Sequence, residues 1–163
     1  MNQNLQIIKA KPENSDIKLA IQKTAFQSEA QLHNNFNIPP LVQSYESIIK
    51  DFQHYTFFKA VLNNRIVGAV KTSLIENNIV WIGRLVVHPD FQRQEIGSAL
   101  MNYIEVIYAE AFKFMLFTTE KSIQNIQFYE NHGYNITGSI TEPGHDNIAL
   151  VKMEKPVLNN ETV

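Results

Sequence analysis

The segment from Gln92 to Ala99 has the residue types of an anion-binding loop. An apolar run ends at His88, and an amphipathic helical pattern begins near Gly97. At such a junction the first helical N–H groups have no intrahelical acceptor, and the helix dipole attracts negative charge. Gly97 would let a phosphate approach the backbone, and Arg93 could add positive charge. The segment therefore predicts a phosphate site, although an ordinary turn with a small packing residue would have the same pattern.

Two common phosphate-binding motifs are absent from this segment. A nucleotide P-loop needs a glycine followed by Lys and then Ser or Thr. A dinucleotide-binding fold needs three spaced glycines, with an acidic residue about 20 positions later. Neither pattern occurs between Gln92 and Ala99.

A third pattern fits. The loop resembles the acyl-CoA signature of the GNAT superfamily of N-acetyltransferases, written Q/R-x-x-G-x-G/A. Gln92 and Gly97 match that signature, and Glu95 stands where its first glycine is usual. A second stretch, residues 122–134 (SIQNIQFYENHGY), is similar to another motif of the same family. Ser122 takes the place of an asparagine found in many members. The resemblance extends from about residue 4 to residue 155.

The resemblance implies that acetyl-CoA binds between two separating strands. The fourth strand would offer main-chain groups to the pantetheine arm, and the loop after it would hold the pyrophosphate. The valines of this strand are also expected to be buried, so both roles coexist. The residues expected to bind acetyl-CoA are Leu85, Val86, Val87, Gln92, Arg93, Gln94, Glu95, Ile96, Gly97, Ser98, Ala99, Ser122, Asn125 and Tyr129.

Tyr129 corresponds to the tyrosine that, in many family members, protonates the departing thiolate. A phenol, with a pKa near 10, is protonated at neutral pH and can donate as the thioester bond breaks. The acceptor amine must in turn lose a proton. The positions where many members carry the base are Trp81 and Gly83 here, and neither can act as one. We expect Glu120 as the base, with another carboxylate, a water chain or a partly neutral amine as alternatives.

The acceptor pocket is expected in the region before the strand hairpins. Two prolines stiffen a connection flanked by aromatic and aliphatic residues, although the same segment could simply pack on the sheet. The residues expected to contact the acceptor are Phe36, Ile38, Pro40, Tyr45, Trp81 and Gly83. No cluster of carboxylates indicates a polyamine or aminoglycoside pocket.

Glu95 raises a separate question, because an acidic side chain stands in a loop expected to bind an anion. If its backbone were helical, the position would not need glycine's conformational freedom. The carboxylate could then lie against the helix N-terminus and compete with the pyrophosphate. The alternative is a side chain that points to solvent.

The elements that must position these residues form one α+β domain over residues 1–155, followed by a loose tail at 156–163. The resemblance implies a mixed, mostly antiparallel twisted sheet of about seven strands with four helices, splayed between strands four and five. Alternating patterns predict strands at residues 5–9, 56–62, 66–75, 79–88, 114–118, 134–140 and 148–153. Hairpin turns are predicted at Asn63-Asn64-Arg65 and at Glu76-Asn77-Asn78, and a final hairpin is predicted across Pro143-Gly144. Helices are predicted after Ser15, at 44–52, from Gly97 to near Lys113, and at 122–132.

Composition excludes several other classes of protein. The net charge is −2, and the 14 Lys and Arg form no basic stripe, so a nucleic-acid partner is not expected. There is no cysteine, the five histidines have no metal-site spacing, and no apolar run approaches the roughly 18 residues of a membrane span. We expect a cytoplasmic enzyme that acetylates a primary amine of a small molecule or peptide, and exposed edge strands would allow a homodimer. The competing hypotheses are a non-catalytic acyl-CoA sensor and an interaction domain that has lost cofactor binding.

Overall fold

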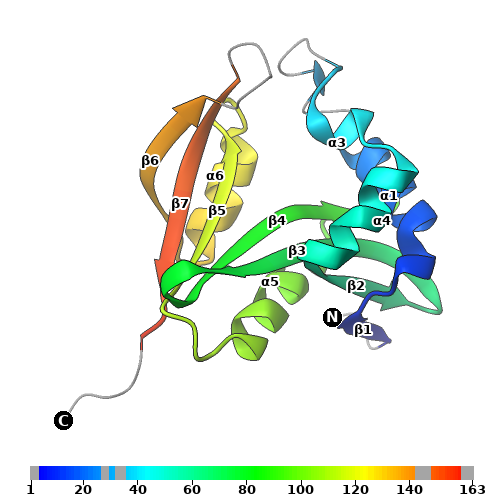
Figure 1. Cartoon of the computed structure of the whole chain (residues 1–163), viewed down its shortest axis with the longest axis horizontal. Helices are drawn as coiled ribbons and strands as arrows, with labels where there is room; N and C mark the ends of the chain where they lie inside the picture. Colours follow the sequence, from blue (N-terminus) through cyan, green and yellow to red (C-terminus); the bar gives the residue numbers. More distant parts are fainter. Residues whose placement is uncertain (1–3, 27–29, 32–35, 142–147, 159–163) are drawn as a thin grey trace.

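A computed structural model describes residues 4–26, 30–31, 36–141 and 148–158, and Figure 1 shows the chain as a twisted sheet with helices on both faces. The seven strands lie in the order β1-β2-β3-β4-β5-β7-β6. They are β1 (Leu5–Lys9), β2 (Thr56–Leu62), β3 (Arg65–Ile75), β4 (Ile79–Val87), β5 (Lys113–Thr119), β6 (Asn135–Thr141) and β7 (Ala149–Pro156). The described α-helices are α1 (Ser15–Ala25), α3 (Pro39–Val42), α4 (Tyr45–His54), α5 (Ile96–Ile107) and α6 (Ile123–Asn131).

Strand pairing confirms the predicted mixed sheet and its splay. All neighbouring strands are antiparallel except β4 and β5. These two are paired in parallel only from Ile79 to Ile82 on β4 and from Lys113 to Leu116 on β5. Beyond these pairs β4 continues to Val87 while β5 continues to Thr119, so the two strands separate into a fork. The backbone of the second half of β4 therefore has no strand partner on its β5 side.

The helices divide between the two faces of the sheet. On one face α5 buries an apolar stripe that includes Leu100, Met101 and Ile104, all fully buried in the main core. On the other face α1 packs against β3 and β4, where Ile21 forms a small buried cluster with Ala69 and Val86. Figure 1 shows α3 and α4 beside α1 on this second face. The fork between β4 and β5 thus has α5 on one side and the α1, α3 and α4 group on the other.

Asparagine residues form the tight turns that the sequence predicts between the strands. Asn63 and Asn64 both have positive φ in the β2–β3 turn, and Asn77 and Asn78 do so between β3 and β4. Asparagine tolerates the left-handed region because its short polar side chain bonds locally. These turns hold β2, β3 and β4 in consecutive antiparallel order.

Two helix predictions need correction. The described residues contain five α-helices, because the Pro39-Pro40 segment, expected as a stiff connection, begins the short helix α3, where proline suits the first helical position. Helix α5 ends at Ile107, not near Lys113, since Tyr108 leaves the helical region of φ and ψ. The sequence pattern predicted a longer helix because Ala111, which follows the end of α5, is also apolar and buried.

The C-terminal strand extends beyond its predicted end. β7 continues to Pro156, one residue into the expected tail, and the N–H of Val157 donates to the carbonyl of Phe112, 3.1 Å away. The turn expected at Pro143-Gly144 lies outside the described residues, as does the tail after Leu158. No helix in the described ranges is long and apolar enough to cross a membrane.

Candidate active site

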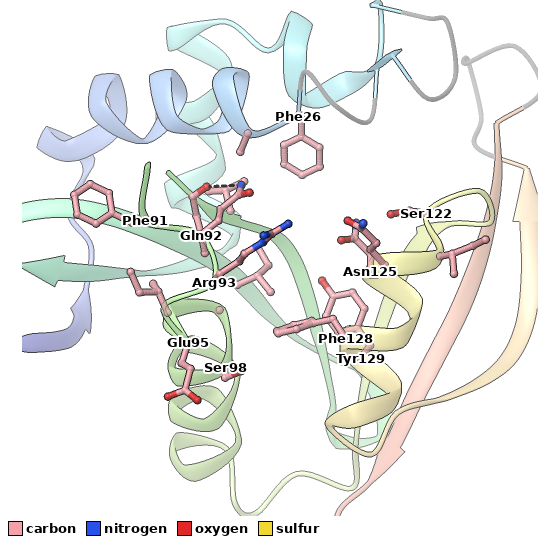
Figure 2. A pocket seen from close by; sticks show the side chains of 18 of the residues that line it. Phe26, Phe91, Gln92, Arg93, Glu95, Ser98, Ser122, Asn125, Phe128 and Tyr129 are labelled. Atoms are coloured by element: carbon pink, nitrogen blue, oxygen red, sulfur yellow. Dashed lines mark hydrogen bonds between the residues drawn. The ribbon is translucent and has the colours of Figure 1, made fainter. Parts of the chain in front are cut away.

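A cavity of about 810 Å³ opens where β4 leaves β5. Its walls come from the end of α1, the second half of β4, the loop before α5, the first turn of α5, and α6 with the turn before it (Figure 2). The lining residues are Ala25, Phe26, Leu85, Val86, Val87, Phe91, Gln92, Arg93, Glu95, Ile96, Gly97, Ser98, Lys121, Ser122, Ile123, Gln124, Asn125, Phe128 and Tyr129. Of the residues expected to bind the cofactor, only Gln94 and Ala99 are not in this lining.

The loop before α5 has two residues in the left-handed region of φ and ψ. Arg93 has φ 64° and Glu95, which is the N-cap of α5, has φ 65°. The condition considered above, a helical backbone at Glu95, is therefore not met, because this position has the left-handed conformation that favours glycine. Its side chain makes no capping hydrogen bond, and Figure 2 shows the carboxylate directed away from Arg93 and Tyr129.

The left-handed backbone at Glu95 leads to a stability prediction. A residue with a Cβ pays about 1–2 kcal/mol in this region, whereas glycine pays about 0.5–1 kcal/mol through its freer unfolded chain. Glu95→Gly should therefore raise the free energy of unfolding by about 0.5–1 kcal/mol in urea titrations. Glu95→Lys is the matched control, because it removes the carboxylate but keeps the Cβ. Equal stability of the two variants would contradict this account.

Gly97 allows the start of α5 to approach α6. A Cβ at this position would lie 3.3 Å from the Phe128 ring, closer than such contacts normally are. The Phe128 ring in turn packs at a tilt against His132, with ring centroids 4.5 Å apart, and the carbonyl of Phe128 lies 2.7 Å from the His132 Nδ1. Phe128 therefore packs between α5 and α6, and its contact with Gly97 joins the two walls of the cavity.

Gln92 and the basic residues differ in what they do in the loop. The Gln92 side-chain amide donates to the carbonyl of Val87, 3.3 Å away, which ties the loop to the end of β4. Arg93 and Lys121 are exposed cations on opposite walls of the cavity. Together with the first N–H groups of α5, which have no intrahelical acceptor, they make this end of the cavity attractive to an anion.

Tyr129 lies at the other end of the same cavity. Its ring packs edge-on against Phe128 and Tyr134, with centroids 5.2 and 6.1 Å away. Figure 2 shows its hydroxyl directed into the space between the α5 loop and α6. Tyr134 beneath it is buried, and burial raises the pKa of that phenol, so Tyr134 stays neutral. The Tyr129 phenol, which faces the cavity, thus packs on the neutral ring of Tyr134.

The structure does not bring Glu120 into this cavity. Glu120 is exposed in the turn after β5, and its N–H donates to the carbonyl of Ala149. Ser122, its neighbour, occupies the N-cap position of α6 but makes no capping hydrogen bond through its side chain. Among the described lining residues the only carboxylate is Glu95 and there is no histidine. The described lining therefore has no carboxylate or imidazole directed toward Tyr129.

The residues expected to contact the acceptor are also outside the cavity lining. Ile38 is buried in a cluster with Ala30 and Ile148, and Pro40 is buried in α3. Phe36 and Tyr45 are about half exposed, at 51% and 49%. The region therefore packs partly on the sheet, as the alternative reading held, and its contact with an acceptor stays a prediction.

Trp81 and Gly83, two positions apart on β4, are adjacent in space. A Cβ built on Gly83 would lie only 2.0 Å from the Trp81 ring, so the indole covers the glycine. The strand position expected for a base is thus occupied by a large aromatic surface that requires glycine beneath it.

Several lining residues were not predicted. Phe26 and Ala25 come from the end of α1, Phe91 from the turn after β4, and Lys121, Ile123 and Gln124 from the start of α6. Lys121 carried a usable signal, because a cation beside a helix start often accompanies an anion site. The α1 residues carried none, since only the packing of α1 on β4 brings them to the cavity.

Comparison with known proteins identifies the family. Residues 23–134, more than half of the chain, match the sequence profile of the acetyltransferase (GNAT) family. The chain belongs to the GNAT family. A curated relative of this GNAT protein is UPF0157 protein YqkA of Bacillus subtilis (strain 168), 27% identical over 118 residues. That match covers 71% of this chain and 33% of YqkA, so the chain spans about a third of the relative's length.

Solved structures agree with the GNAT fold. The ribosomal-protein-S18-alanine N-acetyltransferase from Escherichia coli superposes with a TM-score of 0.79 at 16% identity, covering 98% of each chain. The PaiA N-acetyltransferase from Thermoplasma acidophilum, solved in complex with coenzyme A, gives a TM-score of 0.77 at 16% identity. That match covers 93% of this chain and 98% of the other. At such low identity these likenesses establish the fold alone.

Proposed function

We propose that this GNAT protein is an N-acetyltransferase that transfers the acetyl group of acetyl-CoA to a primary amine of a small molecule or peptide. The observation that supports it most is the fork between β4 and β5. The fork opens onto a cavity with an anion-attracting helix start at one end and the Tyr129 phenol at the other. The residues present suit acetyl-CoA, because unpaired β4 backbone can bond a pantetheine arm and Arg93 and Lys121 can face a pyrophosphate.

In the proposed reaction the amine nitrogen attacks the thioester carbonyl carbon directly, within a ternary complex. A C–N bond forms and the C–S bond breaks, and a β4 main-chain N–H near Val87 stabilises the oxyanion. Tyr129 donates its proton to the departing sulfur. The nitrogen loses one proton, which returns to the Tyr129 oxygen through water, so the products are the N-acetylated amine and free CoA thiol.

A non-catalytic acyl-CoA sensor is the second candidate. It is favoured by one observation, namely that the described lining has no histidine and that its single carboxylate, on Glu95, is directed away from Tyr129. The two candidates share acetyl-CoA binding and differ only in turnover with an amine.

Calorimetric titration of acetyl-CoA, followed by thiol release with a panel of primary amines, tests both candidates. We expect micromolar binding by wild type, strengthened about 2- to 5-fold in Glu95→Gly and Glu95→Lys, since both remove a negative charge near a helix N-terminus. Binding with thiol release supports the enzyme, and binding without release from any amine supports the sensor. Absence of binding in all three proteins would contradict both candidates.

A further inference from the structure

Three large apolar side chains lie on the face of the sheet opposite α5. They are Trp81 on β4 and Met115 and Phe117 on β5, and all three are half-buried. Side chains alternate along a strand, so the residues between them face α5. Those alternate residues are fully buried in the main core: Val80, Ile82, Phe114 and Leu116. Among the described residues Trp81, Met115 and Phe117 join none of the apolar core clusters.

This apolar strip, Trp81, Met115 and Phe117, lies at the fork. Trp81 and Met115 are directly paired across β4 and β5. Phe117 follows Leu116, which makes the last β4–β5 pair, so its ring lies where the strands begin to separate. The Trp81 indole leans along β4 over Gly83 in the same direction. The indole therefore reaches Gly83, two residues before Leu85, the first β4 residue that lines the cavity.

The Trp81 indole is held in place by Tyr55, the residue after α4, and by Lys71 of β3. Its ring centroid lies 5.5 Å from that of Tyr55, and the Lys71 ammonium lies 4.3 Å from the Tyr55 ring and 5.7 Å from the Trp81 ring. Lys71 is itself held by Asp51, 3.1 Å away. A fixed aromatic surface loses little entropy when a ligand packs on it, so it is suited to binding.

Charges around the strip do not favour a polycation. Lys71 pairs with Asp51 on one side. On the other side Glu154, the β7 residue opposite Met115, pairs with Lys113 and Lys152. Within the described part of this face each of these two carboxylates already pairs with a lysine. Neither is therefore available to bind an ammonium group of a polyamine.

We propose that the strip is the acceptor subsite and that the acceptor is a primary amine joined to an aromatic ring by a short apolar linker. The inference rests on the proposed acetyl transfer and adds the chemical class of the acceptor. An aromatic ring would pack on Trp81 and Phe117 in stacked or edge-on contacts, which directs the amine through the fork toward the thioester. The reaction itself is the transfer described above, with the C–N bond formed to this amine.

The single tryptophan allows a binding test that does not depend on turnover. Trp81 is the only tryptophan of the chain, so tryptophan fluorescence reports on the strip itself. The full chain, with CoA present, is titrated with 2-phenylethylamine, ethylamine and spermidine. We expect a saturable fluorescence change with 2-phenylethylamine and none with the other two amines.

Two variants test the contact directly. Phe117→Ala should weaken 2-phenylethylamine binding at least 10-fold, and Met115→Ala should weaken it less, with the Kd for acetyl-CoA unchanged in both. Phe112→Ala is the matched control, since Phe112 is 65% exposed outside the strip and should bind like wild type. Circular dichroism confirms folding, and Met115→Ala serves as the test if Phe117→Ala does not fold.

The outcomes separate this inference from the proposed function. No saturable change with 2-phenylethylamine, an equal response to spermidine, or an unchanged affinity in both strip variants would overturn the aromatic subsite. Acetylation of spermidine but not of 2-phenylethylamine would also overturn it while leaving acetyl transfer intact. Binding of 2-phenylethylamine at the strip without thiol release would support the subsite and contradict the transferase.

Discussion

Tyr129→Phe is expected to lower kcat for amine acetylation by about 100-fold or more, because a positioned acid contributes about 10²–10⁴-fold. The variant removes only the hydroxyl that faces the cavity and keeps the ring that packs on Phe128 and Tyr134. Acetyl-CoA binding should therefore stay within about 2-fold of wild type, since the lost interaction is made only as the C–S bond breaks.

Steady-state thiol release measures kcat, and calorimetry measures acetyl-CoA binding. Tyr103→Phe is a suitable control, because Tyr103 packs on Phe58 in the main core and does not line the cavity. An unchanged kcat in Tyr129→Phe would remove Tyr129 as the acid. A loss of acetyl-CoA binding equal to the loss of turnover would instead mean that its hydroxyl only holds the ligand.

The second large effect is expected at Lys18, a buried lysine of α1. Lys18 is 4% exposed, and its ammonium donates to the Gln22 side-chain oxygen, 2.9 Å away. The groups that face it are Lys71 of β3, Arg84 of β4, Asp51 of α4 and the Phe57 ring of β2, 5.0 Å away. Burial, then the charges of Lys71 and Arg84, lower the pKa of Lys18 from 10.5 to about 7, and Asp51 opposes this shift.

The lowered pKa makes stability depend on pH in a defined direction. Between about pH 7 and the unfolded value near 10.4, the unfolded chain binds the Lys18 proton and the folded chain does not. Stability therefore rises with pH across this window, by at most about 1.4 kcal/mol per pH unit. Below about pH 7 both states are protonated, so the Lys18 contribution no longer changes.

Lys18→Met should remove this dependence. From pH 7.5 to 9.5 we expect wild type to gain about 2 kcal/mol of unfolding free energy relative to Lys18→Met, in urea titrations at each pH. The comparison between pH values cancels the constant cost of leaving the Gln22 oxygen without its donor. Lys50→Met, at an exposed lysine of α4, should keep the wild-type slope. Equal slopes in wild type and Lys18→Met would show that Lys18 is charged throughout.

Local patterns in the sequence were sufficient for the order of elements and for most of the cavity. Alternation and the asparagine turns predict β2, β3 and β4, because both depend on residues within a few positions of one another. The loop before α5 and the Tyr129 motif are likewise continuous segments. Their residue types could therefore be matched to a family without any knowledge of packing.

Contacts between distant segments decided the rest. Glu95 has a left-handed backbone where the loop from β4 enters α5, although glutamate itself does not favour that conformation, so its residue type did not predict it. Trp81 contacts Tyr55, and Lys18 meets Lys71 and Arg84, only once α1 and α4 pack on the sheet. Burial, and with it the pKa of Lys18 and the aromatic surface at the fork, is a property of which segments meet, so only the tertiary structure determined it.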